Sequence, residues 1–456
     1  MRILVSLALF TAVSAVAFWG ADGAFTATRS RTEAVANLDP RFAVVDRTPG
    51  YGFEFQRTMP DPVNALHVAD ETDQSIQGLV YVGMAGPGSV HRVSMQSIGV
   101  PMIISGGLGD MIRFGSCQVN RLALRDLDGD GRLDMLASTS QVHPRGRPKL
   151  CVFDATLDAP TLRAVARPDI KSSWSHSLGF LDRPGASPPV SVFSTFCGYG
   201  EVVEYRMEKA DEAAGFASER LSWKVVGQLP TSGEWLEVAD ADNDGRDDVC
   251  VAGGFALNQA EILLYRSDAP GAPLRLEQRV SEDNRFGNVR FTVAALGSTG
   301  ERDVLAWWCT DIAGGDAEVI RYRLGPDGIR ERTVLAKGPA ARLWSDDGQF
   351  TTGDLDGDGR AEVWFGTQGG QLWRYAPAVS PKLERVAIFK DSLGPIAIGP
   401  DFMVGKLRPA LFLGWKTSIF TLTRLPCPRR DPLNLPPTGR AHSLTDRGEA
   451  DHPPVG

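Results

Sequence analysis

The sequence predicts an all-β fold, a seven-bladed β-propeller of four-stranded antiparallel blades, and three observations support this. Short runs rich in β-branched and aromatic residues are separated by Gly, Pro and Asp turns, as in half-buried antiparallel strands. These runs recur with a period of 56 to 58 residues, which is typical of propeller repeats. No segment shows a long apolar stripe at helical spacing, so little helix is expected.

The period is measured between anchor residues at the end of the first strand of each repeat. Successive anchors are separated by 56, 56, 58, 56 and 58 residues, and a seventh repeat has its anchor near Pro400. The propeller is therefore expected to span residues 41–425. The first six anchors are Asp70, Asp126, Asp182, Asp240, Leu296 and Asp354.

Each repeat predicts four strands of distinct character. The first ends at the anchor, as in WLEVAD, and the second is strongly apolar, as in DVCVAG. The third alternates aromatic or arginine positions, as in EILLYRS, and the fourth is more polar and outermost, as in LRLEQRVSED. The seventh repeat has three strands, so residues 41–48 are expected to complete the last blade and close the ring, which removes an exposed strand edge.

Three loops repeat one acidic pattern, with carboxylates at positions 1, 3, 5 and 9 and glycine at position 6. Calcium takes about six to eight oxygen ligands, and such a loop offers four carboxylates and the carbonyl of position 7. We therefore expect three structural Ca²⁺ sites, in which each arginine contributes only its carbonyl. The expected ligands are Asp126, Asp128, Asp130, Arg132 and Asp134; Asp240, Asp242, Asp244, Arg246 and Asp248; and Asp354, Asp356, Asp358, Arg360 and Glu362.

By these loops and this period, the chain resembles the FG-GAP or VCBS repeat family, whose best-known members form the propeller of integrin α-subunits. The resemblance implies that each acidic loop joins the first and second strands of a blade and binds calcium on one face of the disc. The turns after Asp70, Asp182 and Leu296 lack the full acid set. Calcium is therefore not expected in blades 1, 3, 5 and 7.

The N-terminus predicts export. Arg2 precedes an apolar run from Ile3 to Trp19 and then small residues, so residues 1–23 are expected to be a signal peptide, or alternatively an uncleaved anchor. Residues 24–40 are expected to be a linker, and the proline-rich segment 426–456 a disordered tail. No second apolar span follows, so the protein is expected to be secreted, periplasmic or at the cell surface, where calcium is plentiful.

Charge and cysteine content narrow the function classes. The net charge is -8, and three bound dications would bring it to -2. No basic cluster points to nucleic acid as a partner. The six cysteines fit no zinc or redox motif, and the first choice for a disulfide, if one exists, is Cys117 with Cys151. Cys197, Cys250 and Cys309 lie in or just after apolar second strands and are expected to be buried thiols.

A candidate ligand site is expected at the mouth of the central channel, opposite the calcium loops. Five consecutive repeats have a hydrogen-bonding residue six positions before the anchor, and tryptophans stand nearby. Such a polar ring flanked by tryptophans suits a carbohydrate, although a solvated channel mouth and core tryptophans would give the same pattern. The candidates are Asn64, Asn120, Trp174, His176, Glu234, Trp235, Arg290 and Trp344.

These features leave three hypotheses of function. The leading one is a secreted interaction module that binds a glycan or an extracellular protein, with calcium stiffening the blades. The second is an exported polysaccharide-active enzyme of lyase type, with His176 and Glu234 as acid and base. The third is a structural envelope protein. No nucleophile elbow, HExxH, P-loop or Rossmann glycine pattern is present.

Overall fold

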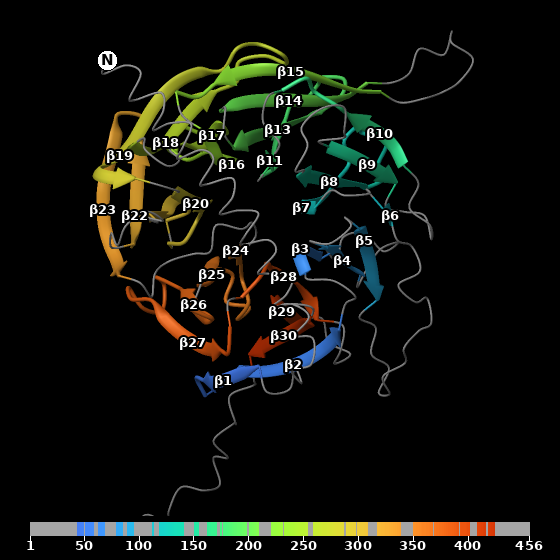
Figure 1. The fold of residues 1–456 in the computed structure, drawn as a ribbon. Helices are drawn as coiled ribbons and strands as arrows, with labels where there is room; N and C mark the ends of the chain where they lie inside the picture. The colour runs from blue at the N-terminus through green and yellow to red at the C-terminus, as the bar shows by residue number, and fades with distance from the viewer. Residues whose placement is uncertain are drawn as a thin grey trace, which may run out of the picture.

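The computed structural model describes residues 43–49, 51–58, 63–68, 79–84, 89–94, 112–113, 118–140, 150–154, 162–170, 174–175, 177–197, 200–208, 220–230, 232–253, 259–286, 289–297, 299–308, 317–338, 350–367, 369–391, 393–401, 408–415 and 418–424. Within these ranges the chain forms thirty strands in seven antiparallel sheets (Figure 1).

The first four sheets follow the chain in order. The first contains β3 (Val63–Val68), β4 (Leu79–Met84), β5 (Ser89–Ser94) and β6 (Ile112–Arg113). The second contains β7 (Gln118–Arg125), β8 (Asp134–Ser140), β9 (Leu150–Asp154) and β10 (Leu162–Ala166). The third contains β11 (Trp174–Ser175), β12 (Gly179–Asp182), β13 (Val190–Cys197), β14 (Glu201–Glu208) and β15 (Arg220–Gln228). The fourth contains β16 (Gly233–Ala239), β17 (Asp248–Gly253), β18 (Gln259–Arg266) and β19 (Arg275–Phe286).

The last three sheets include two strands from the N-terminal segment. The fifth contains β20 (Val289–Ala294), β21 (Asp303–Trp308), β22 (Glu318–Gly325) and β23 (Gly328–Lys337). The sixth contains β24 (Phe350–Gly353), β25 (Glu362–Gly366), β26 (Gln371–Tyr375), β27 (Glu384–Phe389) and β1 (Val44–Arg47). The seventh contains β28 (Ile396–Asp401), β29 (Arg408–Trp415), β30 (Ser418–Arg424) and β2 (Tyr51–Thr58).

The sheets surround a common axis, with first strands on the inside and fourth strands on the outside (Figure 1). Neighbouring inner strands contact each other from β16 to β20, β20 to β24 and β24 to β28, and β28 contacts β3. Strand β3 contacts β7, β13 contacts β16, and the second and third sheets meet through β10 and β15. The prediction of an all-β propeller of four-stranded antiparallel blades is confirmed.

The N-terminal segment closes the ring differently from the prediction. Residues 41–48 do not complete the last blade: β1 pairs with β27 as a fifth strand of the sixth sheet. Instead β2 pairs with β30 and forms the outer strand of the seventh sheet. The physical reason lies in the strand sequence: β2 spans eight residues, YGFEFQRT, and has aromatic residues at the alternate positions 51, 53 and 55. By contrast, the four residues of β1 are mostly exposed.

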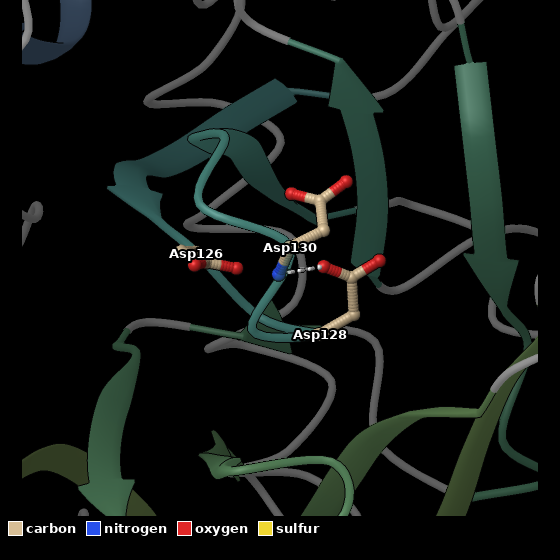
Figure 2. A group of neighbouring side chains, drawn as sticks. All are labelled: Asp126, Asp128 and Asp130. Atoms are coloured by element: carbon tan, nitrogen blue, oxygen red, sulfur yellow. Dashed lines mark hydrogen bonds between the residues drawn. The ribbon is translucent and has the colours of Figure 1, made fainter.

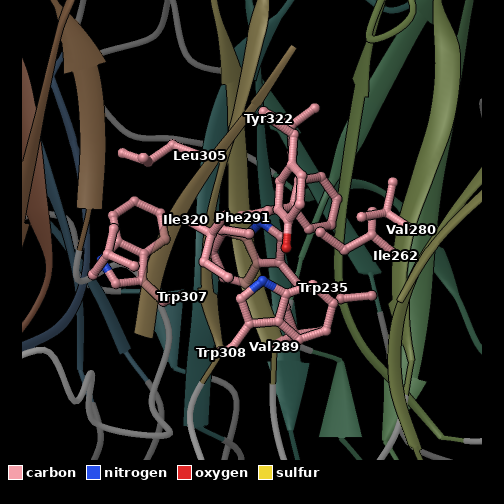
Figure 3. Close-up of a cluster of buried hydrophobic side chains, with 14 of the residues drawn as sticks. Trp235, Ile262, Val280, Val289, Phe291, Leu305, Trp307, Trp308, Ile320 and Tyr322 are labelled. Carbon is pink, nitrogen blue, oxygen red and sulfur yellow. The ribbon is translucent and has the colours of Figure 1, made fainter. Parts of the chain in front are cut away.

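Apolar packing between sheets forms the core. The second strands β17 and β21 are buried along their whole length, as their unbroken apolar sequences predict. A cluster of buried side chains continues from β16 to β26 and includes Trp307, Trp308 and Tyr322 (Figure 3). Burial of apolar side chains on this scale is the main stabilising contribution to folding.

Candidate metal loops and the central channel

The three acidic loops lie where the sequence places them, between the first and second strands of their sheets. They join β7 to β8, β16 to β17, and β24 to β25. In each loop, carboxylate oxygens of the aspartates at positions 1, 3 and 5 lie within 4.8 Å of one another. Figure 2 shows the first group. The groups are Asp126, Asp128 and Asp130; Asp240, Asp242 and Asp244; and Asp354, Asp356 and Asp358.

Backbone hydrogen bonds hold the first aspartate of each loop in the same orientation. The N–H of the glycine at position 6 donates to this carboxylate at 2.9 Å for Asp126, 3.0 Å for Asp240 and 2.7 Å for Asp354. These glycines have φ between 82° and 89°, a left-handed conformation that side chains disfavour. The glycines therefore allow the tight turn that brings the three carboxylates of each group close together.

The carboxylate at position 9 begins the second strand and stands apart from these groups. Asp134 accepts hydrogen bonds from the Leu127 N–H at 3.2 Å and from Arg163. Glu362 accepts from Trp364 Nε1 at 2.8 Å and from Arg374 Nε at 2.9 Å. Two of the three carboxylates expected to ligate at this position are therefore held by arginine.

Asp248 is the third carboxylate at position 9. Its Oδ2 accepts from the Ala241 N–H at 3.2 Å, but its Oδ1 accepts no hydrogen bond among the described residues. Burial raises the pKa of Asp248 to about 7, and the neighbouring Asp242 adds to the effect. Burial likewise raises the pKa of Asp134 to about 6 despite Arg163. Burial of the carboxylate is the main cause of both shifts.

The donor sets fit a hard divalent cation. Each group offers carboxylate oxygens and a nearby carbonyl and contains no sulfur or imidazole, which is the ligand chemistry of calcium. The carboxylates also outnumber their cationic partners: in the third loop, one arginine, Arg374, contacts Asp356 and Glu362, while Asp354 and Asp358 complete the acidic set. A bound dication would compensate the remaining charge.

Arginine contacts the corresponding acid in the fifth sheet, whose turn lacks the acid set. Asp303 begins β21, as Asp248 begins β17, and its carboxylate contacts Arg321 at 2.9 Å and Arg323 at 3.2 Å. The carboxylate-arginine pair is thus a feature of the blade that occurs without the acidic loop.

Three of the eight predicted ligand residues have described side chains, and all three are buried. Trp235 is 2% exposed, Asn120 is 3% and Arg290 is 3%. The Trp235 ring lies 4.1 Å from the Arg121 guanidinium carbon, 5.5 Å from that of Arg290 and 4.9 Å from the Phe350 ring. Side chains from β7, β16, β20 and β24 thus meet around one indole.

The remaining predicted ligand residues are placed less fully. Asn64, Trp174 and Glu234 lie in β3, β11 and β16, and the structure describes their backbone only. His176 and Trp344 lie outside the described residues. Residues 1–42 and 425–456, which include the predicted signal, linker and tail, also lie outside them.

Sequence reasoning missed Glu237, which stands beside Trp235 in β16. Its Oε2 accepts the Val293 N–H at 2.9 Å, and its Oε1 lies 3.4 Å from Trp235 Nε1. Enclosure within the ring raises the pKa of Glu237 to about 7. The available signal was the strand WLEVAD itself, in which Trp235 and Glu237 lie on one face at period two.

The structure describes the side chains of two of the cysteines considered in the sequence. Cys250 is a buried thiol in β17, and Cys151 is buried in β9. Cys117, Cys309 and Cys427 lie outside the described residues.

Where the chain is described, it has no helix long and apolar enough to cross a bilayer.

Comparisons with known proteins give little further information. No protein-family model and no curated protein matches the chain. Among solved structures, the chain is similar to the crystal structure of BBS1N in complex with ARL6DN, soaked with lead, with a TM-score of 0.48 and 9% sequence identity. The similarity covers 84% of this chain and 97% of that chain.

Proposed function

We propose that this chain is an exported calcium-binding β-propeller that acts as a binding module for a glycan or an extracellular protein. The observation that carries the proposal is the acidic group repeated in three loops, each between the first and second strands of its sheet. Calcium would hold each loop closed and thereby stiffen one face of the disc. The expected affinity is that of extracellular modules, with a Kd of about 10⁻⁴ to 10⁻³ M.

Asp248 adds support from outside the three acidic groups. It is fully buried, and its Oδ1 accepts no hydrogen bond among the described residues. Arg266 Nη2 lies 3.5 Å from this oxygen, and a buried carboxylate oxygen without a hydrogen bond is costly unless a cation or a donor satisfies it. A calcium ion bound beside Asp242 and Asp244 would supply a second cationic partner.

We also propose that the chain is an FG-GAP or VCBS-type propeller and that all seven sheets are blades of one ring. The acidic loops supply the sequence argument, and the contact between β28 and β3 joins the last sheet to the first. An experimental structure in calcium tests the blade count. A ring with another number of blades, or with the β3–β6 sheet outside it, would overturn this part.

The ligand site is proposed at the mouth of the channel opposite the acidic loops. Because Asn120, Trp235 and Arg290 are buried, they would form the floor of the site and leave ligand contact to Trp174, His176, Glu234 and Trp344. Planar aromatic rings and hydrogen-bonding side chains are the groups that bind sugars. A protein ligand would use the same aromatic groups.

The test is incubation of residues 24–456 with a panel of polysaccharides, in calcium and in chelator, with retention and released oligosaccharides scored together. The proposal predicts retention that weakens in chelator, without release of product. Trp174→Ala should lower retention, whereas Trp223→Ala on the outer strand β15 is the matched control and should not. Product release that His176→Ala abolishes would contradict the binding module and favour the lyase.

A further inference from the structure

The three acidic loops differ in what holds the carboxylate at position 9. In the first and third loops, both oxygens of this carboxylate accept hydrogen bonds. Asp134 uses one oxygen for the Leu127 N–H and the other for Arg163. Glu362 uses one oxygen for Trp364 and both for Arg374. In these two carboxylates, every oxygen therefore accepts a hydrogen bond from the protein.

In the second loop, Asp248 keeps one oxygen available. Its Oδ1 accepts no hydrogen bond from the described residues, and Arg266 Nη2 lies 3.5 Å away. Arg266 donates instead to Asp244 at 2.6 Å and to Glu277 at 3.0 Å. Because the guanidinium is drawn to these partners, it does not reach hydrogen-bonding distance of Asp248 Oδ1.

The carboxylate at position 3 also bonds arginine in the first and third loops but not in the second. Arginine donates to its Oδ2 at 2.8 Å in both the first loop, where Arg163 bonds Asp128, and the third loop, where Arg374 bonds Asp356. In the second loop, the neutral amide of Gln278 donates to Asp242 Oδ2 at 3.0 Å. The arginine of the second loop, Arg266, bonds the carboxylate at position 5 instead, so the carboxylates at positions 3 and 9 of this loop accept no hydrogen bond from arginine among the described residues.

We propose that the loops are unequal and that the loop from Asp240 to Asp248 binds calcium most tightly. This inference rests on the proposed calcium binding. The second loop supplies five protein ligands, namely three aspartates, the Arg246 carbonyl and Asp248 Oδ1. The first and third loops supply four, and water completes their coordination. A site with fewer protein ligands binds the cation more weakly.

The direct test uses proteins that each retain one intact loop. The double variant Asp126→Asn with Asp354→Asn keeps the second loop, and the corresponding pairs keep the first or the third. Calcium titration calorimetry should give a Kd about tenfold lower for the second loop than for either of the others. Equal affinities for the three proteins, each shown to be folded by circular dichroism, would overturn the inference.

The carboxylate at position 9 provides matched controls within the same fold. Asp248→Asn in the second-loop protein should weaken calcium binding about tenfold, because it removes a ligand. Asp134→Asn and Glu362→Gln in their own single-loop proteins should change the Kd less than about threefold, because those carboxylates bind arginine. A loss of the same size in all three proteins would show that the ninth carboxylate ligates everywhere and would contradict the proposal.

A measurement on the unmodified chain avoids dependence on the variants. In a calcium titration from about 10⁻⁵ to 10⁻² M, hydrogen exchange followed by mass spectrometry should show protection at lower calcium concentration in residues 240–248 than in 126–134 and 354–362. Simultaneous protection of all three loops would contradict the order. Absence of calcium binding at millimolar concentration would instead refute the proposed function itself, so the two failures are distinguishable.

Discussion

The side-chain amide of Asn243 forms two hydrogen bonds with the backbone of Arg302. Asn243 Oδ1 accepts the Arg302 N–H at 2.7 Å, and its Nδ2 donates to the Arg302 carbonyl at 3.1 Å. Asn243 occupies position 4 of the second acidic loop, where the other two loops have glycine, and its φ of 61° is left-handed. The loop of the fourth sheet is thereby joined to the turn before β21.

Replacing Asn243 with glycine tests this connection. Glycine adopts the same φ without strain but removes the two hydrogen bonds to Arg302 and a third, from Nδ2 to the Leu324 carbonyl at 3.3 Å, so we expect the free energy of unfolding to fall by about 1–2 kcal/mol. Thermal and denaturant unfolding in calcium measure the change. The control is Gly357→Asn at the same position of the third loop, which should leave stability within about 0.5 kcal/mol. An unchanged stability in Asn243→Gly would show that the amide contributes nothing.

Glu237 predicts a pH dependence of stability. Its carboxyl titrates near 4.5 when unfolded and at about 7 in the folded protein, so the folded state holds more protons between these values. The free energy of unfolding therefore falls as pH rises from 4.5 to 7. Asp134 and Asp248 contribute to the same slope, so Glu237→Gln should reduce it and raise stability at pH 8 by about 2 kcal/mol. Chemical denaturation at several pH values measures it, and an unchanged slope in the variant would contradict the assignment.

Arg374 predicts a large structural effect within the third loop. It is buried and contacts Asp356, Glu362 and Glu384. Arg374→Gln leaves these carboxylates without their cation, so we expect a loss of about 3–5 kcal/mol in the free energy of unfolding. Arg360→Gln, an exposed residue in the same loop, is the control and should change stability by less than about 0.5 kcal/mol. Equal effects of the two substitutions would contradict the role given to Arg374.

The pairing of β2 with β30 predicts that two N-terminal truncations of the chain will differ in stability and aggregation. A chain that begins at residue 50 loses β1 but keeps β2, and it should remain monomeric and unfold cooperatively. A chain that begins at residue 60 leaves β30 as an uncovered edge, so it should aggregate or unfold at lower temperature. Light scattering after size exclusion and thermal melting distinguish the two. Identical behaviour would show that β2 does not close the seventh sheet in solution.

Much of the fold could be predicted because repetition amplifies weak local signals. The strands lie where apolar and polar residues alternate in the sequence. The acidic loops lie at the expected turns because Gly131, Gly245 and Gly359 adopt the left-handed conformation that these turns need. The exchange of β1 and β2 could not be predicted from the repeats, since the choice between them depends on contacts with β27 and β30 across the whole chain.

The side-chain partners were the least predictable part of the site. The arginines that contact the acidic loops are Arg163 in β10, Arg266 in β18 and Arg374 in β26. They lie outside the loops in sequence, so no loop motif includes them. The burial of Trp235 depends on Arg121 and Phe350, which come from other sheets. These interactions arise from closure of the ring, and a local pattern does not specify which residues will meet there.

Calcium content is the most direct test of the central claim. Purified residues 24–456 should be equilibrated in millimolar calcium or in chelator, analysed for bound metal and unfolded thermally under both conditions. The account predicts three calcium ions per chain, one for each acidic group, and a higher melting temperature in calcium, since a ligand that binds only the folded state stabilises it. Less than one ion per chain with an unchanged melting temperature would contradict it.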